Sequence, residues 1–414
     1  MIGRLLADVT PLRVSPAFRR FWIGSICSGI GSQMTTFAVA LQVYLLTHSS
    51  AAVGAVGLAI AVPGIVVALV SGSLIDAVDR RVLVLCATAL QMVLSAALAV
   101  QAFAELDRVW LLYLLVAFQS MVGAVNSPAR RTFMPRLLPP DKMAAGAALT
   151  MLVMNTSAVV GPALAGVIAA AGGLKVCYLV DALSFTAALY GVGRLPAMRP
   201  EGAGTRAGLR SVTDGLRFIK RSRVLSGALL ADLNAMVLAM PVALFPAINA
   251  ERFGGSPRTL GLMTASLAIG GLTGSTLSGP VSRVARQGRA MLVAGAIWGV
   301  AVAGFGLADG IVLTLGALIL AGLVDSSSVV LRTTIIQIAT PDAYRGRISA
   351  AEYVVGSACP QLGNFRAGAI GSLTTSNASA FTGGAAAALG AGIIALTFPA
   401  LWRYRAIETA IVSL

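Results

Sequence analysis

The amino-acid sequence predicts an all-α, polytopic membrane protein with twelve transmembrane helices in two six-helix, pseudo-symmetric halves. Hydrophobic residues make up 57% of the 414 residues and charged residues only 11%, whereas a soluble domain carries about 25% charged residues. Apolar runs of about twenty residues, the length that crosses a bilayer, recur along the whole chain. Basic residues gather in alternate loops between these runs, as the positive-inside rule requires.

The hydrophobic runs and the basic loops together predict the topology. We expect spans near residues 19–47, 51–75, 82–104, 109–128, 143–170, 174–194, 223–248, 257–280, 290–307, 311–333, 343–371 and 377–402. Arginine and lysine concentrate in the two tails and in the loops after the even-numbered spans. Such loops stay in the cytoplasm, so we predict a multi-pass protein of the cell (inner or plasma) membrane with both termini cytoplasmic.

The longest polar segment, 194–223, lies just before the midpoint and divides the chain. We predict an N-terminal half at 1–193, a cytoplasmic basic linker at 194–222 and a C-terminal half at 223–414. Arg131-Thr132 and Pro140-Asp141 recur in register as Arg332-Thr333 and Pro341-Asp342, which indicates parallel repeats. Chance matching is the alternative.

Within the linker, apolar residues from Leu209 to Ile219 have loosely helical spacing. This spacing predicts a short amphipathic helix at the inner membrane surface, with its basic side toward lipid headgroups. A solvated linker is the alternative.

Several function classes are excluded by what the sequence contains. The net charge of +15 is spread over short loops, so it does not indicate nucleic-acid binding. One histidine, His48, and four widely spaced cysteines give no metal-site pattern, and we expect no metal and no cofactor. The chain has no phosphate-binding G-x-x-x-x-G-K-[ST] loop and no nucleophile–base cluster, so we do not predict an enzyme.

The loop after span two reads Gly72-Ser-Leu-Ile-Asp76-Ala-Val-Asp79-Arg80-Arg81. It resembles the G-x-x-x-D-x-x-G-R-R loop of the major facilitator superfamily, with Asp79 where that family commonly has glycine. The resemblance implies a latch that holds the two halves in the outward-facing state. Its expected members are Gly72, Asp76, Arg80, Arg81, Arg131 and Glu352.

Span five contains Ser157-Ala-Val-Val-Gly161-Pro162-Ala-Leu-Ala165-Gly166. Small residues at this spacing let helices pack closely, and a proline inside a helix bends it. The segment resembles the antiporter signature G-x-x-x-G-P-x-x-G-G, with Ser157 and Ala165 in place of glycines. It therefore predicts a bend at Gly161, Pro162 and Gly166.

Segments throughout the chain resemble the enterobactin-exporter branch of the same superfamily. They include 126–141, 160–166, 181–185, 232–236, 240–246 and 331–347. The resemblance implies export of a siderophore, and this branch is close to macrolide and multidrug exporters. It also implies that spans one, four, seven and ten line a central cavity.

Ionisable residues inside spans are candidates for function because burying a charge in a bilayer is costly. Asp232 and Asp325 are predicted to face the cavity and to take up the coupling proton. A hydrogen-bonded structural acid is the alternative for Asp232, and an ion pair with Arg332 is the alternative for Asp325. The uncharged polar residues expected at the cavity are Asn234, Gln33, Gln119 and Asn126.

Arg366 in span eleven needs a partner at its depth, and Asp181 in span six is placed to supply one. We predict an ion pair between them or contact of Arg366 with an anionic cargo.

These observations predict a secondary exporter that works by alternating access. The expected reaction is proton-coupled antiport of a siderophore or similar aromatic amphipathic metabolite. The alternative is a broad-specificity, macrolide-type multidrug:proton antiporter, and a distant one is a non-transporting membrane receptor or scaffold. We expect a monomer whose partners are a small-molecule cargo, protons and membrane lipids.

Overall fold

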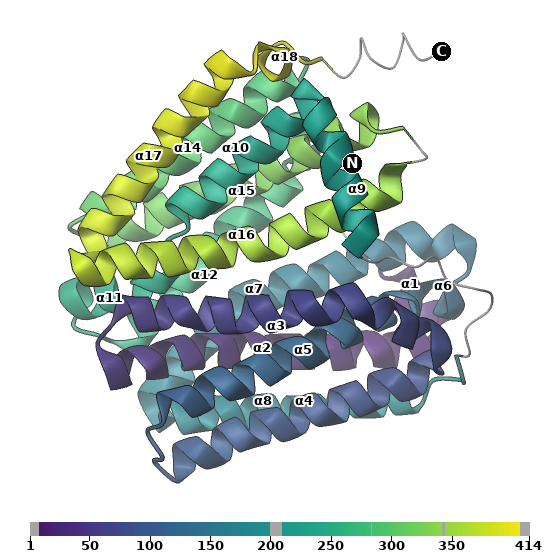
Figure 1. Ribbon diagram of the computed structural model, residues 1–414. Helices are drawn as coiled ribbons and strands as arrows, with labels where there is room; N and C mark the ends of the chain where they lie inside the picture. Colours follow the sequence, from purple (N-terminus) through teal and green to yellow (C-terminus); the bar gives the residue numbers. More distant parts are fainter. Residues whose placement is uncertain (1–7, 199–208, 283, 342–343, 406–414) are drawn as a thin grey trace. The chain divides into compact units, whose positions relative to one another are not determined.

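The computed structural model in Figure 1 describes residues 8–198, 209–282, 284–341 and 344–405. Within these residues all regular structure is helical, which confirms the predicted all-α class. In chain order the helices are α1 (Thr10–Val14), α2 (Pro16–Thr47), α3 (Ser50–Ala77), α4 (Arg80–Phe103), α5 (Val109–Arg131), α6 (Met134–Leu137), η2 (Pro140–Lys142), α7 (Met143–Gly172), α8 (Leu174–Gly193), α9 (Leu209–Arg221), α10 (Arg223–Ala239), η3 (Val242–Leu244), α11 (Phe245–Phe253), α12 (Pro257–Thr276), α13 (Ser278–Ser282), α14 (Gln287–Leu307), α15 (Ile311–Ala339), α16 (Arg345–Leu373), α17 (Ser376–Thr397) and α18 (Pro399–Trp402).

Twelve long helical segments in the described ranges occupy the positions of the twelve predicted spans, with α10, η3 and α11 together forming the seventh. Among the described residues, nine of these segments are long and apolar enough to cross a membrane on composition alone. The other three, α2, α12 and α16, are also at least 20 residues long. Their higher content of polar residues lowers their hydropathy, and polar residues in a span usually face the protein interior.

The chain divides into two compact units. Unit 1 contains Met1–Leu46 and Val62–Arg206, and unit 2 contains Thr47–Ala61 and Ala207–Leu414. The first turns of α3 therefore group with unit 2 and the rest of α3 with unit 1, while α9 belongs to unit 2. The division into 1–193, 194–222 and 223–414 stays a prediction.

Glycines allow the helices of unit 2 to approach closely. A methyl group on Gly322 of α15 would lie 2.0 Å from the carbonyl oxygen of Leu267 in α12, and one on Gly270 of α12 would lie 2.0 Å from that of Ile319. Lipid chains are as apolar as leucine, so membrane helices associate largely through such close van der Waals contact. The α12–α15 crossing therefore requires both glycines.

Replacing Gly322 with leucine is expected to lower the free energy of unfolding by about 1–3 kcal/mol, because the side chain forces α12 and α15 apart. Gly316→Leu on the same helix is the matched control, since nothing lies within 4 Å of the position of its added methyl group. Denaturation by sodium dodecyl sulfate in mixed micelles, followed by tryptophan fluorescence, measures both. Equal stability of the two variants would contradict the close crossing.

The seventh span is broken in its middle. Helix α10 ends at Ala239, and Met240 is extended with φ −71° and ψ 114°. Pro241 follows, and proline disfavours the helical conformation of the residue before it. The chain then resumes as η3 and α11. Backbone groups that are freed at such a break inside a membrane need partners within the protein.

Candidate functional site

A buried ion pair joins two helices of unit 2. The guanidinium of Arg332 on α15 contacts the carboxylate of Asp232 on α10, and these side chains are only 12% and 10% exposed. Removing two charges from water is costly, so each ion depends on the other for stabilisation. The partner of Arg332 is therefore Asp232. In the sequence analysis, an ion pair between Arg332 and Asp325 was given as the alternative role of Asp325.

Two further acids belong to the same charged group. Asp325 lies seven residues before Arg332 on α15, which places both on one face of the helix. The charges of Asp232 and Arg332 act on Asp325 and also on Glu352 of α16. Asp232, Asp325, Glu352 and Arg332 are called the charge cluster below. Its three carboxyl groups outnumber its one guanidinium, so the cluster can accept positive charge.

A polar cavity of about 630 Å³ adjoins the charge cluster through Glu352. It lies between α15 and α16, and hydroxyl, amide and carboxyl groups alternate on its wall with aliphatic ones. The lining residues are Thr333, Ile336, Gln337, Ile338, Thr340, Ile348, Ser349 and Glu352. A wall of this kind can hold an amphipathic molecule and orient its polar groups.

Most of these cavity residues were missed in the sequence analysis, although a signal was present. Thr333, Gln337 and Thr340 recur at spacings of four and three residues, which puts them on one face of a helix. A polar face on a span indicates that it is turned away from lipid.

Arg366 donates hydrogen bonds to the backbone at the break in the seventh span. Its guanidinium donates to the carbonyl oxygens of Leu238 and, at 3.5 Å, Val237 at the end of α10. The side-chain oxygen of Asn364 accepts from the backbone N–H of Ala243 at 3.2 Å. The last carbonyls of a helix lack partners within it and carry partial negative charge. Arg366 therefore caps α10.

Asn234 faces a neighbouring helix of unit 2. Its side-chain amide donates to the carbonyl of Ala387 on α17 at 2.8 Å. A methyl group on Gly390 of α17 would lie 1.9 Å from the Asn234 side-chain oxygen. These contacts pack α10 against α17, and the predicted place of Asn234 at the cavity stays a prediction.

Asp181 lies in a polar network inside unit 1. It is 1% exposed, and one carboxylate oxygen accepts from the hydroxyls of Thr35 on α2 at 2.6 Å and Ser95 on α4 at 2.7 Å. Gln119 on α5 donates to Ser95 at 3.0 Å. The network thus links four helices. The ion pair of Asp181 with Arg366 stays a prediction, because the contacts found for each side chain are with other groups.

The polar network continues along α4 toward Asn126. The Asn126 side chain on α5 donates to Gln91 at 2.7 Å and to Thr88 at 3.4 Å. Thr88, Gln91 and Ser95 lie three and four residues apart, on one face of α4. This periodicity is visible in the sequence, and it explains why Gln119 and Asn126 both turn toward α4.

The antiporter-like segment packs α7 against α2 within unit 1. A methyl group on Gly161 would lie 2.5 Å from the Cβ of Gln33, and one on Gly29 would lie 2.5 Å from the Ser157 hydroxyl oxygen. Pro162 lies inside a continuous α-helix, and Pro162 and Gly166 are both buried. The segment is therefore a close-packing surface, and Gln33 contributes its Cβ to it.

Asp79 stands at the position where the family commonly has glycine, and its side chain stabilises the loop after span two. The Asp79 carboxylate accepts from the backbone N–H of Arg81 at 2.8 Å and from that of Met198 at 3.2 Å. Arg81 donates to the carbonyl of Gly193 at the end of α8. Asp79 has a φ of −55°, so the turn does not require glycine.

The other predicted latch residues have fewer described side-chain contacts. The backbone N–H of Arg80 donates to the carbonyl of Met198 at 3.1 Å, and Arg131 lies at the end of α5. Gly72 lies within α3, and the side chain of Asp76 lies outside the described residues. Glu352 belongs to the charge cluster.

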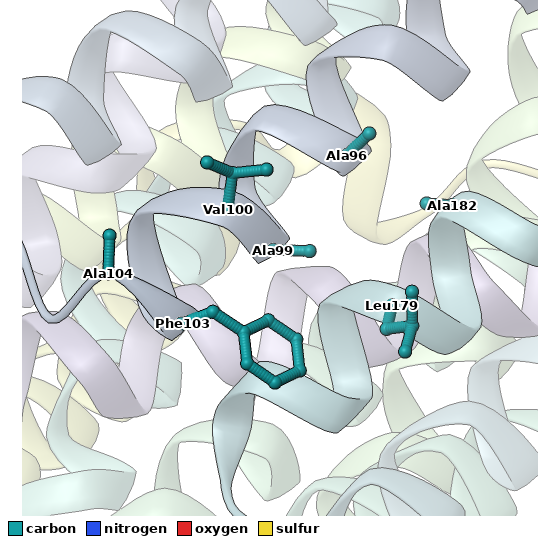
Figure 2. Close-up of a pocket in the computed structure, with 7 residues that line it drawn as sticks. All are labelled: Ala96, Ala99, Val100, Phe103, Ala104, Leu179 and Ala182. Atoms are coloured by element: carbon teal, nitrogen blue, oxygen red, sulfur yellow. The ribbon is translucent and has the colours of Figure 1, made fainter.

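A second cavity, of about 430 Å³, lies between α4 and α8 in unit 1 (Figure 2). The side chains around it are all apolar: Ala96, Ala99, Val100, Phe103, Ala104, Leu179 and Ala182. Such a wall can hold a hydrocarbon chain but has no group that would orient a polar cargo. The polar cavity beside the charge cluster is therefore the stronger candidate for cargo binding.

Twelve helical spans and a buried charge cluster beside a polar cavity are typical of a multi-pass membrane transporter. The sequence model of the transmembrane secretion effector family matches residues 7–410, so the chain belongs to that family. The predicted superfamily membership is confirmed.

Relatives with known names agree with this assignment. The chain is 28% identical over 407 residues to the enterobactin exporter EntS of Shigella boydii serotype 18, covering 97% of this chain and 96% of the relative. EntS of Escherichia coli O139:H28 matches with the same identity and coverage.

Solved structures of transporters have the same fold. A bacterial homologue of the iron transporter ferroportin in its inward-facing state has a TM-score of 0.72 at 18% identity, covering 94% of this chain and 99% of that one. The nucleoside transporter NupG has a TM-score of 0.68 at 13% identity, covering 94% of this chain and 100% of that one. At these identities the likenesses show the fold.

Proposed function

We propose that this chain exports a siderophore, or a similar aromatic amphipathic metabolite, by proton-coupled antiport with alternating access. The observation that carries the proposal is the charge cluster, in which a buried Asp232–Arg332 pair stands beside a polar cavity that includes Glu352. The enterobactin exporters among the relatives support the cargo class. Both termini are proposed to be cytoplasmic, from the distribution of arginine and lysine.

Cargo and protons are exchanged because both compete for the carboxyl groups of the charge cluster. Ionised Glu352 on the cavity wall can accept hydrogen bonds from cargo hydroxyls, and charged acceptors bind more strongly than neutral ones. A proton arriving from outside neutralises one carboxyl of the cluster and weakens that bond, so the cargo is released there. Because cargo and proton favour different states of the same site, each shifts the balance between conformations.

A vesicle experiment tests the proton coupling. Inside-out vesicles with an acidic interior are expected to accumulate a catecholate siderophore, and Asp232→Asn is expected to reduce this accumulation at least about tenfold, because asparagine cannot exchange a proton. Siderophore counterflow without a proton gradient should persist in the variant. Asp214→Asn, in the surface pair with Arg217 on α9, is the matched control. Unchanged proton-driven accumulation in Asp232→Asn would overturn the coupling role.

A panel of macrolides and unrelated lipophilic drugs tests the cargo class in the same vesicles. Transport of the panel as fast as the siderophore would favour a multidrug antiporter. Absence of flux for every compound would favour a receptor or scaffold.

A further inference from the structure

An apolar groove of about 330 Å³ lies between α9 and α10 in unit 2. Four of its residues follow one face of α10, three come from α9, and Val355 of α16 completes it. The lining residues are Leu216, Ile219, Lys220, Ser226, Leu229, Leu230, Leu233 and Val355. Leu216, Leu230 and Leu233 each remain close to 40% exposed, so the groove is open along its length.

Helix α9 is packed against the start of α16 and against α10. A methyl group on Gly215 would lie 2.3 Å from the carbonyl oxygen of Arg347 at the start of α16. The ring of Phe218 stacks on that of Tyr344, with centroids 4.4 Å apart. The Ser226 hydroxyl donates to the carbonyl of Ile219 at 2.7 Å and joins α9 to α10. These contacts use one side of α9 and leave its groove side open.

One basic residue lines this groove, and three others are close to it in the sequence. Lys220 is both exposed and part of the lining, so its aliphatic stem can lie along apolar surface while its ammonium reaches outward. Arg217, Arg221 and Arg223 are also exposed. Asp214 pairs with Arg217 at 3.7 Å, whereas Lys220 is the cation among the residues that line the groove. An apolar groove with a lysine on its wall complements a molecule with a hydrocarbon chain and an anionic head.

We propose that this groove binds one acidic phospholipid, with an acyl chain along Leu229, Leu230 and Leu233 and the phosphate at Lys220. In the predicted orientation α9 lies at the inner membrane surface, where basic residues attract anionic lipid headgroups. A second copy of the chain is disfavoured as occupant because like charges would meet. The cargo has its own polar cavity on α15 and α16.

Native mass spectrometry of the full chain in detergent tests this proposal. Palmitoyl-oleoyl-phosphatidylglycerol is titrated against phosphatidylcholine with the same acyl chains. The first bound molecule of phosphatidylglycerol is expected to bind at least about tenfold more tightly than the first bound molecule of phosphatidylcholine. The reason is that only the phosphatidylglycerol headgroup carries net negative charge. Lys220→Gln is expected to reduce this preference to about twofold or less. Leu230→Trp fills the groove and is expected to weaken the binding of both lipids at least about fivefold.

Two matched controls keep the measurement specific. Lys142→Gln removes a lysine of η2 that pairs with Asp141 at 3.5 Å, and Leu396→Trp changes a leucine on α17 that is 83% exposed; both should bind lipid as the unchanged protein does. Leu233→Trp replaces Leu230→Trp if that variant does not fold. Equal binding of the two lipids, or full preference in Lys220→Gln, would overturn the proposal. Displacement of the lipid by chain-free glycerophosphoglycerol at similar concentration would overturn it too, because the acyl chain would then contribute nothing.

Discussion

Arg332→Met is expected to lower the free energy of unfolding by about 3–5 kcal/mol, because it leaves the Asp232 carboxylate buried without its partner. Both side chains are about one-tenth exposed, so water cannot replace the guanidinium. Proton-driven transport should be lost in the same variant. Denaturation in mixed micelles measures the first effect and vesicle accumulation of siderophore the second.

The double variant Asp232→Leu with Arg332→Met separates stability from function. Removing both charges is expected to restore stability to within about 1 kcal/mol, since replacing a buried pair by apolar side chains is often neutral, while transport stays absent. Arg217→Met, in the surface pair with Asp214, should change stability by less than about 1 kcal/mol. A small effect of Arg332→Met on stability would contradict the buried pair.

Arg366→Met is expected to lower the free energy of unfolding by about 3 kcal/mol, because the carbonyls of Val237 and Leu238 lose a charged donor. Backbone amides near the break, in residues 236–244, should exchange hydrogen faster as α10 frays. Hydrogen–deuterium exchange with mass spectrometry resolves this segment. Arg366→Lys should recover only part of the stability, since an ammonium lacks the planar fork that reaches two carbonyls.

Arg252→Met provides a matched comparison for Arg366→Met. Arg252 on α11 donates to the carbonyls of Phe305, Gly306 and Ala308 at the end of α14, so its loss should fray α14 and leave 236–244 protected. If Arg366→Met leaves exchange in 236–244 unchanged but abolishes siderophore binding, Arg366 acts on the cargo and the capping role is wrong.

Arginine caps the ends of several helices in the described part of the chain. Arg81 donates to the last residue of α8, Arg252 to the end of α14 and Arg366 to the end of α10. From sequence, Arg81 was assigned to a latch and Arg366 to an ion pair or an anionic cargo. A carbonyl at a helix end is present in every sequence, so no residue type marks it as the partner of a distant arginine.

The charge cluster, too, was only partly predictable from the sequence. Asp232 and Asp325 were predictable as intramembrane acids because each interrupts an apolar run. Which of them pairs with Arg332 was not predictable. Asp325 is near Arg332 along α15, yet the partner is Asp232, one hundred residues away in sequence. That choice depends on how α10 and α15 cross, and glycines elsewhere in unit 2 show that such crossings are set by backbone contact.

The sequence by itself determined the all-α membrane fold, the positions of the twelve spans and the superfamily. Bilayer thickness imposes a length and a hydropathy on each span, and these are local properties that a sequence displays directly. Only the tertiary structure decided that Asp232 pairs with Arg332, that Arg366 caps a broken helix and that a groove forms beside α9. Those features depend on which faces of distant helices meet, and close packing rather than residue type fixes that geometry.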